Sequence, residues 1–496
     1  MKKYFPILII LTIIKLVIHL YGNHNYGFHR DELLHLSASE HLAWGYFEFP
    51  PFIALVGKVA HFVFGYSLSG VRFFSTLAGV LILVLCCLVA IELGGKKKAV
   101  LLAGTAVLSF IPYYRNHMLF QPVAFDQLFW IVGFYFLLKY FNSKNEKFLI
   151  YLGISCGLGL MNKYTFLIWI MGIVIGLFFY QKGILFKNRT LYVGGLITLI
   201  IFLPNVFWQY DHGFPALLHL QKLKESQLNQ NGIFDFVLGQ LKHPLVLSIS
   251  LIGLYAYFFD SKLKEYKVMG IAAVVTFIVM WFMQSKEYYF FAMYPILFAA
   301  GAVKVERLLQ GSPKWNYAVA AALFIPIIPF IPHAIPVLPI STYVSYLNLK
   351  PEDDGRVILT DDFADMFGWE EQVQLVHNLY KSLPSSERKK YMIWAENYGE
   401  AGAIQIIGKK YKLPNPVCAH GSFWSWGTGN TKGEFCISIG NEKRVIEKFF
   451  KTCKLVKMIK HKYVIDEENN IPVYLCSDPK IDFIQNWSLL ESHVFD

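Results

Sequence analysis

Eleven apolar segments occupy most of the first 340 residues, and they constrain the fold more than any other feature. A helix of ~20 apolar residues crosses the hydrocarbon core of a bilayer. Charged residues make up only 16% of the 496 residues, against roughly 25% in a soluble domain. The sequence therefore predicts an α-helical polytopic membrane protein. The segments are residues 4–21, 69–92, 98–114, 122–141, 147–161, 164–181, 190–209, 243–260, 267–284, 288–306 and 316–338.

The lysine-rich loops between these segments predict one orientation in the membrane. They alternate along the chain and all fall on one side, which the positive-inside rule assigns to the cytoplasm. The net charge of +11 is attributed to these loops, and not to nucleic-acid binding. The other side receives the first outer loop, residues 22–68, and everything after about residue 339. We expect an integral membrane protein whose polar outer loops and C-terminal region are extracytoplasmic.

The composition changes near residue 340, where five prolines between 326 and 339 end the last apolar segment. Beyond them strand and helix patterns alternate, which is typical of a small α/β domain. We therefore divide the chain into a transmembrane domain, 1–340, and a soluble domain, 341–496. The predicted elements of the second domain are strands at 357–360 and 391–394 and helices at 369–382 and 400–411.

Seven cysteines fall into two groups. Three lie in apolar segments and are expected to be core residues. The other four lie in the C-terminal region, where an oxidising compartment would allow two disulfides, but their spacing leaves the pairing open. These four are Cys418, Cys436, Cys453 and Cys476.

The triplet Arg30-Asp31-Glu32 follows the first apolar segment directly. Ionisable groups next to hydrocarbon are costly, so such a cluster indicates a functional site. Asp31 is predicted to be a general base, since partial burial can raise a carboxyl pKa toward the value that this task needs. Glu32 would assist it, orient it or bind a metal. The alternative is an interfacial salt bridge between Arg30 and one carboxylate. Two helices are also expected in this loop, at 35–46 and 52–64.

Further polar residues stand at the outer ends of apolar segments. Asp126 lies about one turn into a segment, where an acid should face a polar cavity. Arg72 and Arg115 lie near the same membrane face, and Lys163 and Lys286 lie where the positive-inside rule disfavours lysine. Four cations on the carboxylate side predict binding of an anionic group such as phosphate. The alternative for each is an interfacial anchor that extends to water.

Metal and nucleotide motifs are weak or missing. Glu32 and His35 are spaced to share a helix face, but no strong ligand motif accompanies them. The sequence therefore leaves a divalent cation, Mg²⁺ or Mn²⁺, as an open question. It contains no glycine-rich nucleotide loop, Walker motif or nucleophile elbow, which argues against a soluble nucleotide donor.

Several motifs together resemble the membrane glycosyltransferases of family 39, which include protein O-mannosyltransferases and lipid A aminoarabinose transferases. The architecture resembles their GT-C fold. Two C-terminal stretches, 363–369 and 397–403, resemble a soluble domain of a bacterial subgroup, which implies location in a bacterial inner (cytoplasmic) membrane. The motifs are Tyr26-Gly27-Phe28-His29-Arg30-Asp31-Glu32, His41-Leu42-Ala43-Trp44-Gly45-Tyr46 with Pro50-Pro51, Gly157-Leu158-Gly159-Leu160-Met161-Asn162-Lys163-Tyr164, and Tyr288 to Pro295.

The resemblance implies a polyprenyl-phosphate sugar donor that binds from the outer leaflet, with Asp31 as catalytic base. Many relatives place a second acid in a Thr-Asp pair where this chain reads Gln121-Pro122, and the nearest acid is Asp126. The candidate catalytic residues are Asp31, Glu32 and Asp126. The candidate contacts to the donor phosphate are Arg72, Arg115, Lys163, Lys286 and Tyr289.

The expected reaction moves the sugar to an acceptor hydroxyl on a lipid, a glycan or a protein. One displacement at the anomeric carbon inverts its configuration. Tyr398, Glu400 and Trp424 suit contact with an acceptor, although core packing is the alternative for each. A transporter or flippase for a lipid-linked or anionic substrate is the alternative function, and it predicts polar residues deep in several spans. A non-catalytic scaffold is a third.

Overall fold

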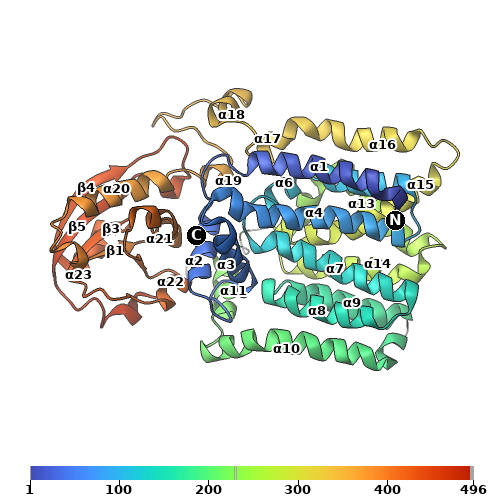
Figure 1. The fold of residues 1–496 in the computed structure, drawn as a ribbon, viewed down its shortest axis with the longest axis horizontal. Helices are drawn as coiled ribbons and strands as arrows, with labels where there is room; N and C mark the ends of the chain where they lie inside the picture. The colour runs from blue at the N-terminus through green and yellow to red at the C-terminus, as the bar shows by residue number, and fades with distance from the viewer. Residues whose placement is uncertain (1, 182, 228–229, 231, 492–496) are drawn as a thin grey trace.

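The structure, a computed structural model, describes residues 2–181, 183–227, 230 and 232–491. Figure 1 shows a bundle of long helices at one end and a five-stranded sheet with its helices at the other. The short helices α2 (Arg30–Glu40) and α3 (Phe52–Phe64) lie between these two parts. The first outer loop is therefore enclosed between the membrane bundle and the C-terminal region.

Each of the eleven predicted segments contains a helix. Within the described residues, seven helices are long and apolar enough to cross a membrane, or eight if the bent pair α12–α13 forms one span. The segments predicted at 98–114, 147–161 and 164–181 form shorter helices. The bundle consists of α1 (Phe5–Gly22), α4 (Leu68–Glu92), α5 (Lys97–Ser109), α7 (Pro122–Ser143), α8 (Lys147–Asn162), α9 (Phe166–Gln181), α10 (Arg189–Asp211), α12 (Asp235–Leu241), α13 (Pro244–Phe259), α14 (Lys267–Phe282), η5 (Glu287–Met293), α15 (Tyr294–Leu308) and α16 (Trp315–Phe324).

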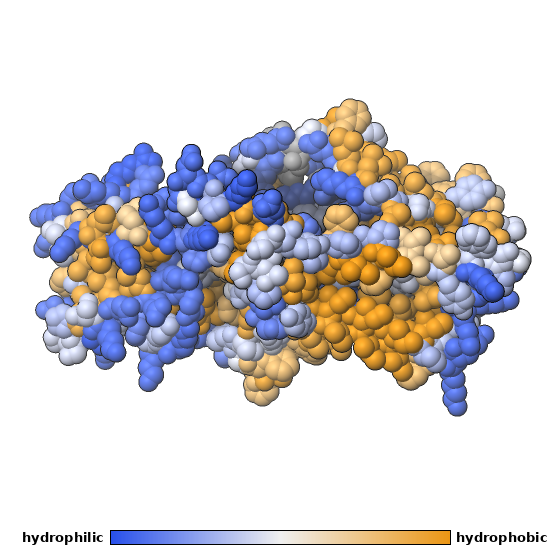
Figure 2. All heavy atoms as spheres, turned by 90° about the horizontal axis from the view of Figure 1, so that it is seen from above, coloured by the Kyte–Doolittle hydropathy of each residue, from blue (hydrophilic) through white to orange (hydrophobic). Residues whose placement is uncertain are grey.

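The outer surface of the bundle is apolar. Figure 2 shows a broad hydrophobic surface over the helices and a mostly hydrophilic surface over the sheet end. Large side chains such as Phe179 and Phe282 are each 71% exposed, and Phe62 of α3 is 89% exposed. Continuous apolar surface of this kind is stable in lipid and unstable in water. The chain is an integral membrane protein, as predicted.

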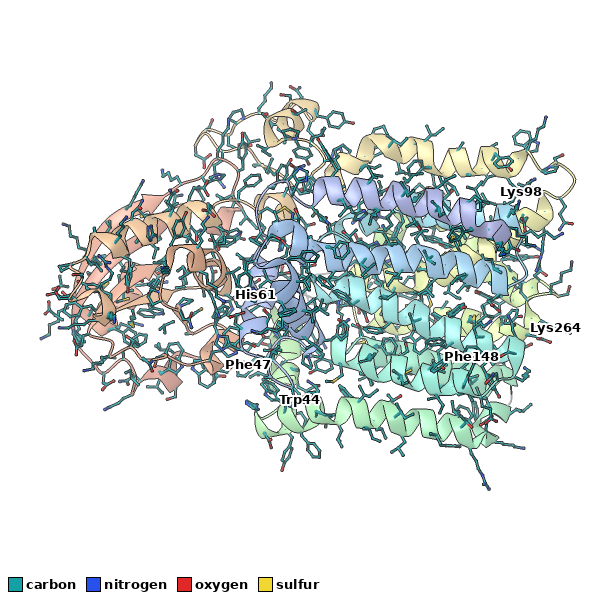
Figure 3. All side chains as sticks on the ribbon, in the orientation of Figure 1. Trp44, Phe47, His61, Lys98, Phe148 and Lys264 are labelled. Carbon is teal, nitrogen blue, oxygen red and sulfur yellow. The ribbon has the colours of Figure 1, made fainter. Side chains whose placement is uncertain are left out.

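The two ends of the bundle differ as the loop pattern predicts. In Figure 3, Lys98 and Lys264, both from predicted cytoplasmic loops, lie at the end of the bundle away from the sheet. Trp44 and Phe47, both from the first outer loop, lie at the end that faces the sheet. The lysine-rich loops and the first outer loop are thus on opposite sides of the apolar zone.

Helix α2 begins earlier than the predicted helix at 35–46, and that prediction is wrong in its bounds. The chain enters the helix at His29, whose ring accepts a hydrogen bond from the backbone of Asp31 over 3.1 Å. The carboxylate of Glu32 accepts from the backbone of His29 over 2.9 Å. This reciprocal cap satisfies two free N–H groups and sets the start at Arg30. The helix predicted at 52–64 is confirmed as α3.

The C-terminal sheet has the strand order β2-β1-β3-β5-β4, which confirms the small α/β domain. Strand β1 pairs in parallel with β2 and β3, and β5 pairs antiparallel with β3 and β4. The strands are β1 (Tyr391–Ala395), β2 (Val417–Cys418), β3 (Phe435–Ile439), β4 (Phe450–Ile459) and β5 (Ile471–Pro479). The helices are α18 (Ile340–Tyr346), α19 (Asp361–Ala364), α20 (Trp369–Ser382), α21 (Tyr398–Ile406), α22 (Ser422–Ser425) and α23 (Lys443–Phe449).

Three of the four predicted C-terminal elements are confirmed. The helix at 369–382 is α20, the strand at 391–394 is β1, and the helix at 400–411 is α21 followed by a 3₁₀ turn. The strand predicted at 357–360 is wrong, because Val357 makes only an isolated bridge with Pro351. Its apolar residues Val357 and Leu359 are buried in a small core between the bundle and the sheet.

Candidate active site

Asp31 stands in the first turn of α2, between the bundle and the C-terminal region. One carboxylate oxygen accepts from Gln121 Nε2 over 2.8 Å, and the other accepts from the Tyr398 hydroxyl over 3.1 Å. Burial favours the neutral acid, but the cationic groups around it, His29 and Arg30 among them, outweigh burial and lower the Asp31 pKa, which is the opposite of the predicted rise. Asp31 is thus an ionised, partly accessible carboxylate that makes no ion pair within 4.0 Å with any described residue.

Glu32 and Arg72, by contrast, are entirely buried and bound to each other. Arg72 Nε donates to Glu32 over 2.9 Å, and its Nη2 donates over 2.8 Å. Burial opposes ionisation of Glu32, but Arg72 outweighs it and lowers the Glu32 pKa. Glu32 also accepts from the backbone of Phe120 over 2.9 Å. The remaining donors of Arg72 reach backbone carbonyls of the first loop, the nearest being Gly27 at 2.8 Å. This pair ties α2 to α4 and to the loop before α7.

Gln121 connects Asp31 to an arginine. Its side-chain oxygen accepts from Arg115 over 3.2 Å while its nitrogen donates to Asp31. Arg115 also makes a two-point ion pair with Asp362 of α19, at 2.8 and 2.6 Å. Arg115 is a quarter exposed, so its cation lies at the surface of the site with a carboxylate of the C-terminal region as its present partner.

A second acid of the C-terminal region, Asp365, lies on the start of α2. It approaches His29 Nε2 at 3.2 Å and Arg30 Nε at 3.6 Å. Burial disfavours the charged imidazole, but Asp365, Asp362 and Asp31 outweigh it and raise the His29 pKa to about 9. Burial raises the Asp365 pKa to about 7, against the attraction of His29 and Arg30. Near neutral pH the buried His29–Asp365 pair therefore retains a proton between its two groups.

Two close contacts explain the small residues in the matching motifs. A Cβ on Gly402 of α21 would lie 2.8 Å from the Cβ of Leu33, so glycine lets α21 approach α2. A Cβ on Gly27 would lie 2.2 Å from the carbonyl oxygen of Met366. The stretches 26–32, 363–369 and 397–403 are therefore packed against one another. This packing places the Tyr398 hydroxyl within hydrogen-bond distance of Asp31.

Asp126 is not part of this cluster. It is buried in α7, where it accepts from Trp130 Nε1 over 2.9 Å and from the Thr165 hydroxyl over 3.1 Å. Lys163 lies nearby, with its ammonium 4.2 Å from the centre of the Tyr289 ring and 5.5 Å from that of Tyr288. One carboxylate oxygen of Asp126 thus bonds within α7, and the other bonds to Thr165, the residue just before α9.

Tyr288 links the lysine side of the site to Arg115. Its hydroxyl is close enough to interact electrostatically with Arg115 and Asp31. Lys286 stands just before it at the start of η5, is partly exposed, and makes no ion pair with any described residue. Lys163, Lys286 and Arg115 are thus grouped around the tyrosine pair of η5.

Two of the three predicted acceptor contacts do not reach Asp31. Glu400 is completely buried, and it accepts from the backbone of Glu396 over 2.9 Å and from the backbone of Asn397, which caps α21, over 3.3 Å. Burial and the nearby Glu468 raise its pKa well above the ordinary value. Trp424 donates to the carbonyl of Trp487 over 3.2 Å and lies against Phe47. Of this set, Tyr398 alone contacts the site carboxylate.

The predicted pair Glu32 and His35 does not form a shared metal site. Glu32 is occupied by Arg72, and the His35 ring bonds to the carbonyl of Phe120 over 3.1 Å. Burial lowers the His35 pKa to about 4, so the ring is neutral at pH 7. Among the residues that the structure describes, no group of three or more His, Cys, Asp or Glu side chains has a metal-binding arrangement.

Four further residues, Gln121, Tyr288, Asp362 and Asp365, complete the site and were not predicted. Gln121 was noted only as a departure from the usual acid. The stretch 363–369 was noted as a motif, but nothing in it indicated contact with residues more than 300 positions earlier. Sequence periodicity cannot show such a contact, because the contact forms only when the C-terminal region docks on the first outer loop.

Comparisons with known proteins agree with the architecture. Residues 48–208 match the family model described as dolichyl-phosphate-mannose-protein mannosyltransferase. The crystal structure of ArnT from Cupriavidus metallidurans bound to undecaprenyl phosphate shares the fold, with a TM-score of 0.63, 12% identity, and coverage of 94% of this chain and 97% of that chain. Its apo structure gives a TM-score of 0.60, 12% identity, and coverage of 96% and 98%. A search of curated protein sequences gave no match.

The two kinds of comparison cover different parts of the chain. The family match covers the first outer loop from residue 48 and the spans up to α10, and the structural likeness extends over nearly the whole chain, sheet included. They confirm the resemblance first indicated by the sequence motifs: the chain is an integral membrane glycosyltransferase of the GT-C fold, similar to those of family 39.

Proposed function

We propose that the chain transfers a sugar from a polyprenyl-phosphate donor to an acceptor hydroxyl on the extracytoplasmic side, with inversion and with Asp31 as general base. The observation that carries the proposal is the contrast between the two adjacent acids. Glu32 is committed to Arg72, whereas Asp31 is ionised, partly accessible and held only by neutral donors. A base must be ionised and within reach of the acceptor proton. Asp31 meets the first requirement, and its partial exposure leaves it open to an acceptor, which supports the second.

The donor phosphate would bind at the cations around η5. Lys163, Lys286 and Arg115 lie on the side of the site where the bundle meets α9 and η5, and Tyr289 lies beneath Lys163. The similarly folded ArnT was crystallised with undecaprenyl phosphate, which supports a lipid phosphate as the ligand of such a fold. A cationic cluster of this kind stabilises the charge that appears on a departing phosphate.

The reaction follows from these positions. The acceptor hydroxyl donates its proton to Asp31 as its oxygen attacks the anomeric carbon. The bond from that carbon to the phosphate oxygen breaks, and polyprenyl phosphate leaves with the electron pair. Gln121 and Tyr398 hold the two Asp31 oxygens, so the base is aimed before the acceptor arrives. A single displacement inverts the configuration.

Arg72 takes a positioning role in this proposal. All of its donors serve Glu32 and the first loop, so none is directed at a ligand. Its pair with Glu32 holds the start of α2 and hence the direction of Asp31. We likewise assign Asp126 to the packing of α7 against α9, since its oxygens accept from Trp130 and Thr165.

A turnover assay on the purified full-length chain tests the proposal. The protein, in lipid vesicles, is given a panel of polyprenyl-phosphate sugars and an extract of envelope lipids, glycans and proteins. Wild type should release free polyprenyl phosphate from one donor, and Asp31→Asn should lower that release by about two orders of magnitude or more. Asp361→Asn, at an exposed neighbour of Asp362, is the matched control and should retain activity. Equal release by wild type and Asp31→Asn would refute the base assignment.

A further inference from the structure

Three of the four C-terminal cysteines stand in a row across the sheet. Cys436 on β3 and Cys453 on β4 are each the register partner of Cys476 on β5, the strand between them. Directly opposed residues of antiparallel strands project to the same face. The three thiols therefore lie side by side on one face. Cys418 on β2 is instead opposite Ala395. The strand register therefore places no cysteine opposite Cys418 for the second of the two disulfides that the sequence allows.

The separation suits a disulfide. Directly opposed residues of antiparallel strands have Cα atoms ~4.5–5.5 Å apart, within the ~4.4–6.8 Å that a disulfide spans. The thiols of Cys453 and Cys476 already interact with each other. Strand β4 is an edge strand, and Cys453 is half-buried there, whereas Cys476 is 1% and Cys436 is 0% exposed. An oxidant in solution would therefore reach Cys453 first.

We propose that Cys453 and Cys476 form a disulfide in the mature protein. In the cell this rests on the extracytoplasmic location given under the proposed function, since that side of the membrane is the oxidising one. The co-reactant is a second disulfide, of a small thiol such as glutathione or of a protein. The Cys453 thiolate attacks it and expels one thiolate, and the Cys476 thiolate then attacks the mixed disulfide and expels the other. Two protein thiols become one disulfide, and two thiols are released.

The bridge would support the active site through one loop. It closes the segment 454–475, which contains the turn between β4 and β5. In that turn Glu468 accepts from Asn397 Nδ2 over 2.9 Å and from Gln372 over 3.0 Å. Asn397 caps α21, whose first residue, Tyr398, donates to Asp31. The cross-link lies within the β4–β5 ladder, several pairs away from this turn. It would stabilise the hairpin that carries Glu468, and through Asn397 the residue that orients the base.

Peptide mapping of the full-length protein tests the sheet geometry. Purified protein is equilibrated with an excess of oxidised glutathione, free thiols are alkylated, and the digest is analysed by mass spectrometry without reduction. We expect a linked Cys453–Cys476 peptide and a Tm about 5 °C above that of the reduced protein. Cys436→Ser and Cys418→Ser should keep the bridge and the shift. Cys453→Ser and Cys476→Ser should lose both.

Two results would overturn the proposal. One is alkylation of all seven cysteines after oxidation, and the other is a Cys436–Cys476 peptide in place of the expected one. The same mapping on cells alkylated before lysis separates the location from the geometry. A bridge that forms with glutathione but is reduced in cells would count against the extracytoplasmic location and against formation in vivo. Glycosyl transfer is measured separately, so its failure is distinguishable from either result.

Discussion

The hydroxyl of Tyr398 donates a hydrogen bond to Asp31 over 3.1 Å, although the two residues are 367 positions apart in the sequence. One comes from the C-terminal region and the other from the first outer loop. The candidate base is thus oriented by both parts of the molecule. Removing the C-terminal region would leave one oxygen of Asp31 without its donor, so that region belongs to the catalytic unit in the proposed reaction.

Tyr398→Phe should shift the pH dependence of turnover. The hydroxyl stabilises the ionised form of Asp31, so its loss raises a pKa that is now depressed. A base works when deprotonated, and activity falls as pH drops through its pKa. The acid limb of the kcat/KM profile should therefore move to higher pH. At pH values below the limb, kcat/KM should fall roughly threefold to thirtyfold relative to wild type. Trp424→Phe, at a residue that does not contact Asp31, is the control. An unmoved acid limb in Tyr398→Phe would contradict this role.

Arg72→Met should destabilise the protein by roughly 3–5 kcal/mol, because it leaves the Glu32 carboxylate buried without its partner. The double variant Glu32→Leu with Arg72→Met should lose less unfolding free energy than the two single variants lose together, since neither charge remains. Thermal unfolding in detergent measures each. Lys443→Met, from an exposed pair with Glu447, should unfold like wild type. Additive losses would mean that the two side chains are not coupled.

Asp362→Asn should strengthen binding of lipid phosphate. The carboxylate now occupies Arg115, and its removal leaves that cation to an anionic ligand. Both side chains are partly exposed, so we expect a modest gain, roughly threefold to tenfold in Kd at low salt and less at high salt. Binding of polyprenyl phosphate to the purified protein is the measurement, and Asp361→Asn should match wild type. Weaker binding in Asp362→Asn would instead make Asp362 a required part of the site.

The contact of His29 with Asp365 should weaken as the pH rises. The folded His29 pKa, about 9, is above its ordinary value near 6.5. The stability that the protonated His29 ring contributes to the folded state is therefore complete below about pH 6.5 and is lost through pH 9. The raised Asp365 pKa acts over an earlier window, between about pH 4 and 7, where the folded state holds a proton that the unfolded chain has lost. The protection factors of residues 361–369 against hydrogen exchange, which correct for the base-catalysed intrinsic rate, should therefore fall between pH 6.5 and 9.5.

Two variants check that assignment. His29→Gln should remove most of the pH dependence in residues 361–369, because a glutamine does not titrate. His24→Gln, at an exposed histidine of the same loop, should keep it. An unchanged profile in His29→Gln would assign the titration to another group.

Much of the fold was predictable because lipid imposes a simple requirement on sequence. Every span needs about 20 apolar residues and satisfies its own backbone, so the segments are visible as uninterrupted runs. Short elements with mixed environments were less predictable. The helix α2 was placed five residues late, since its start depends on a His29–Glu32 cap and not on apolar periodicity. The strand at 357–360 was predicted from apolar residues that the docked core buries without pairing.

The sequence by itself determined the membrane class, the alternation of loops and the first-loop acids, because hydrophobic length and charge are local properties. Only the tertiary structure decided which acid is paired with an arginine and which is partly accessible. Glu32 meets Arg72 because α2 and α4 pack together. Asp31 meets Gln121 because α2 lies against the start of α7, and it meets Tyr398 because the C-terminal region docks on the first loop. Adjacent carboxylates point to different neighbours on a helix, and the identity of those neighbours is a property of packing between distant segments.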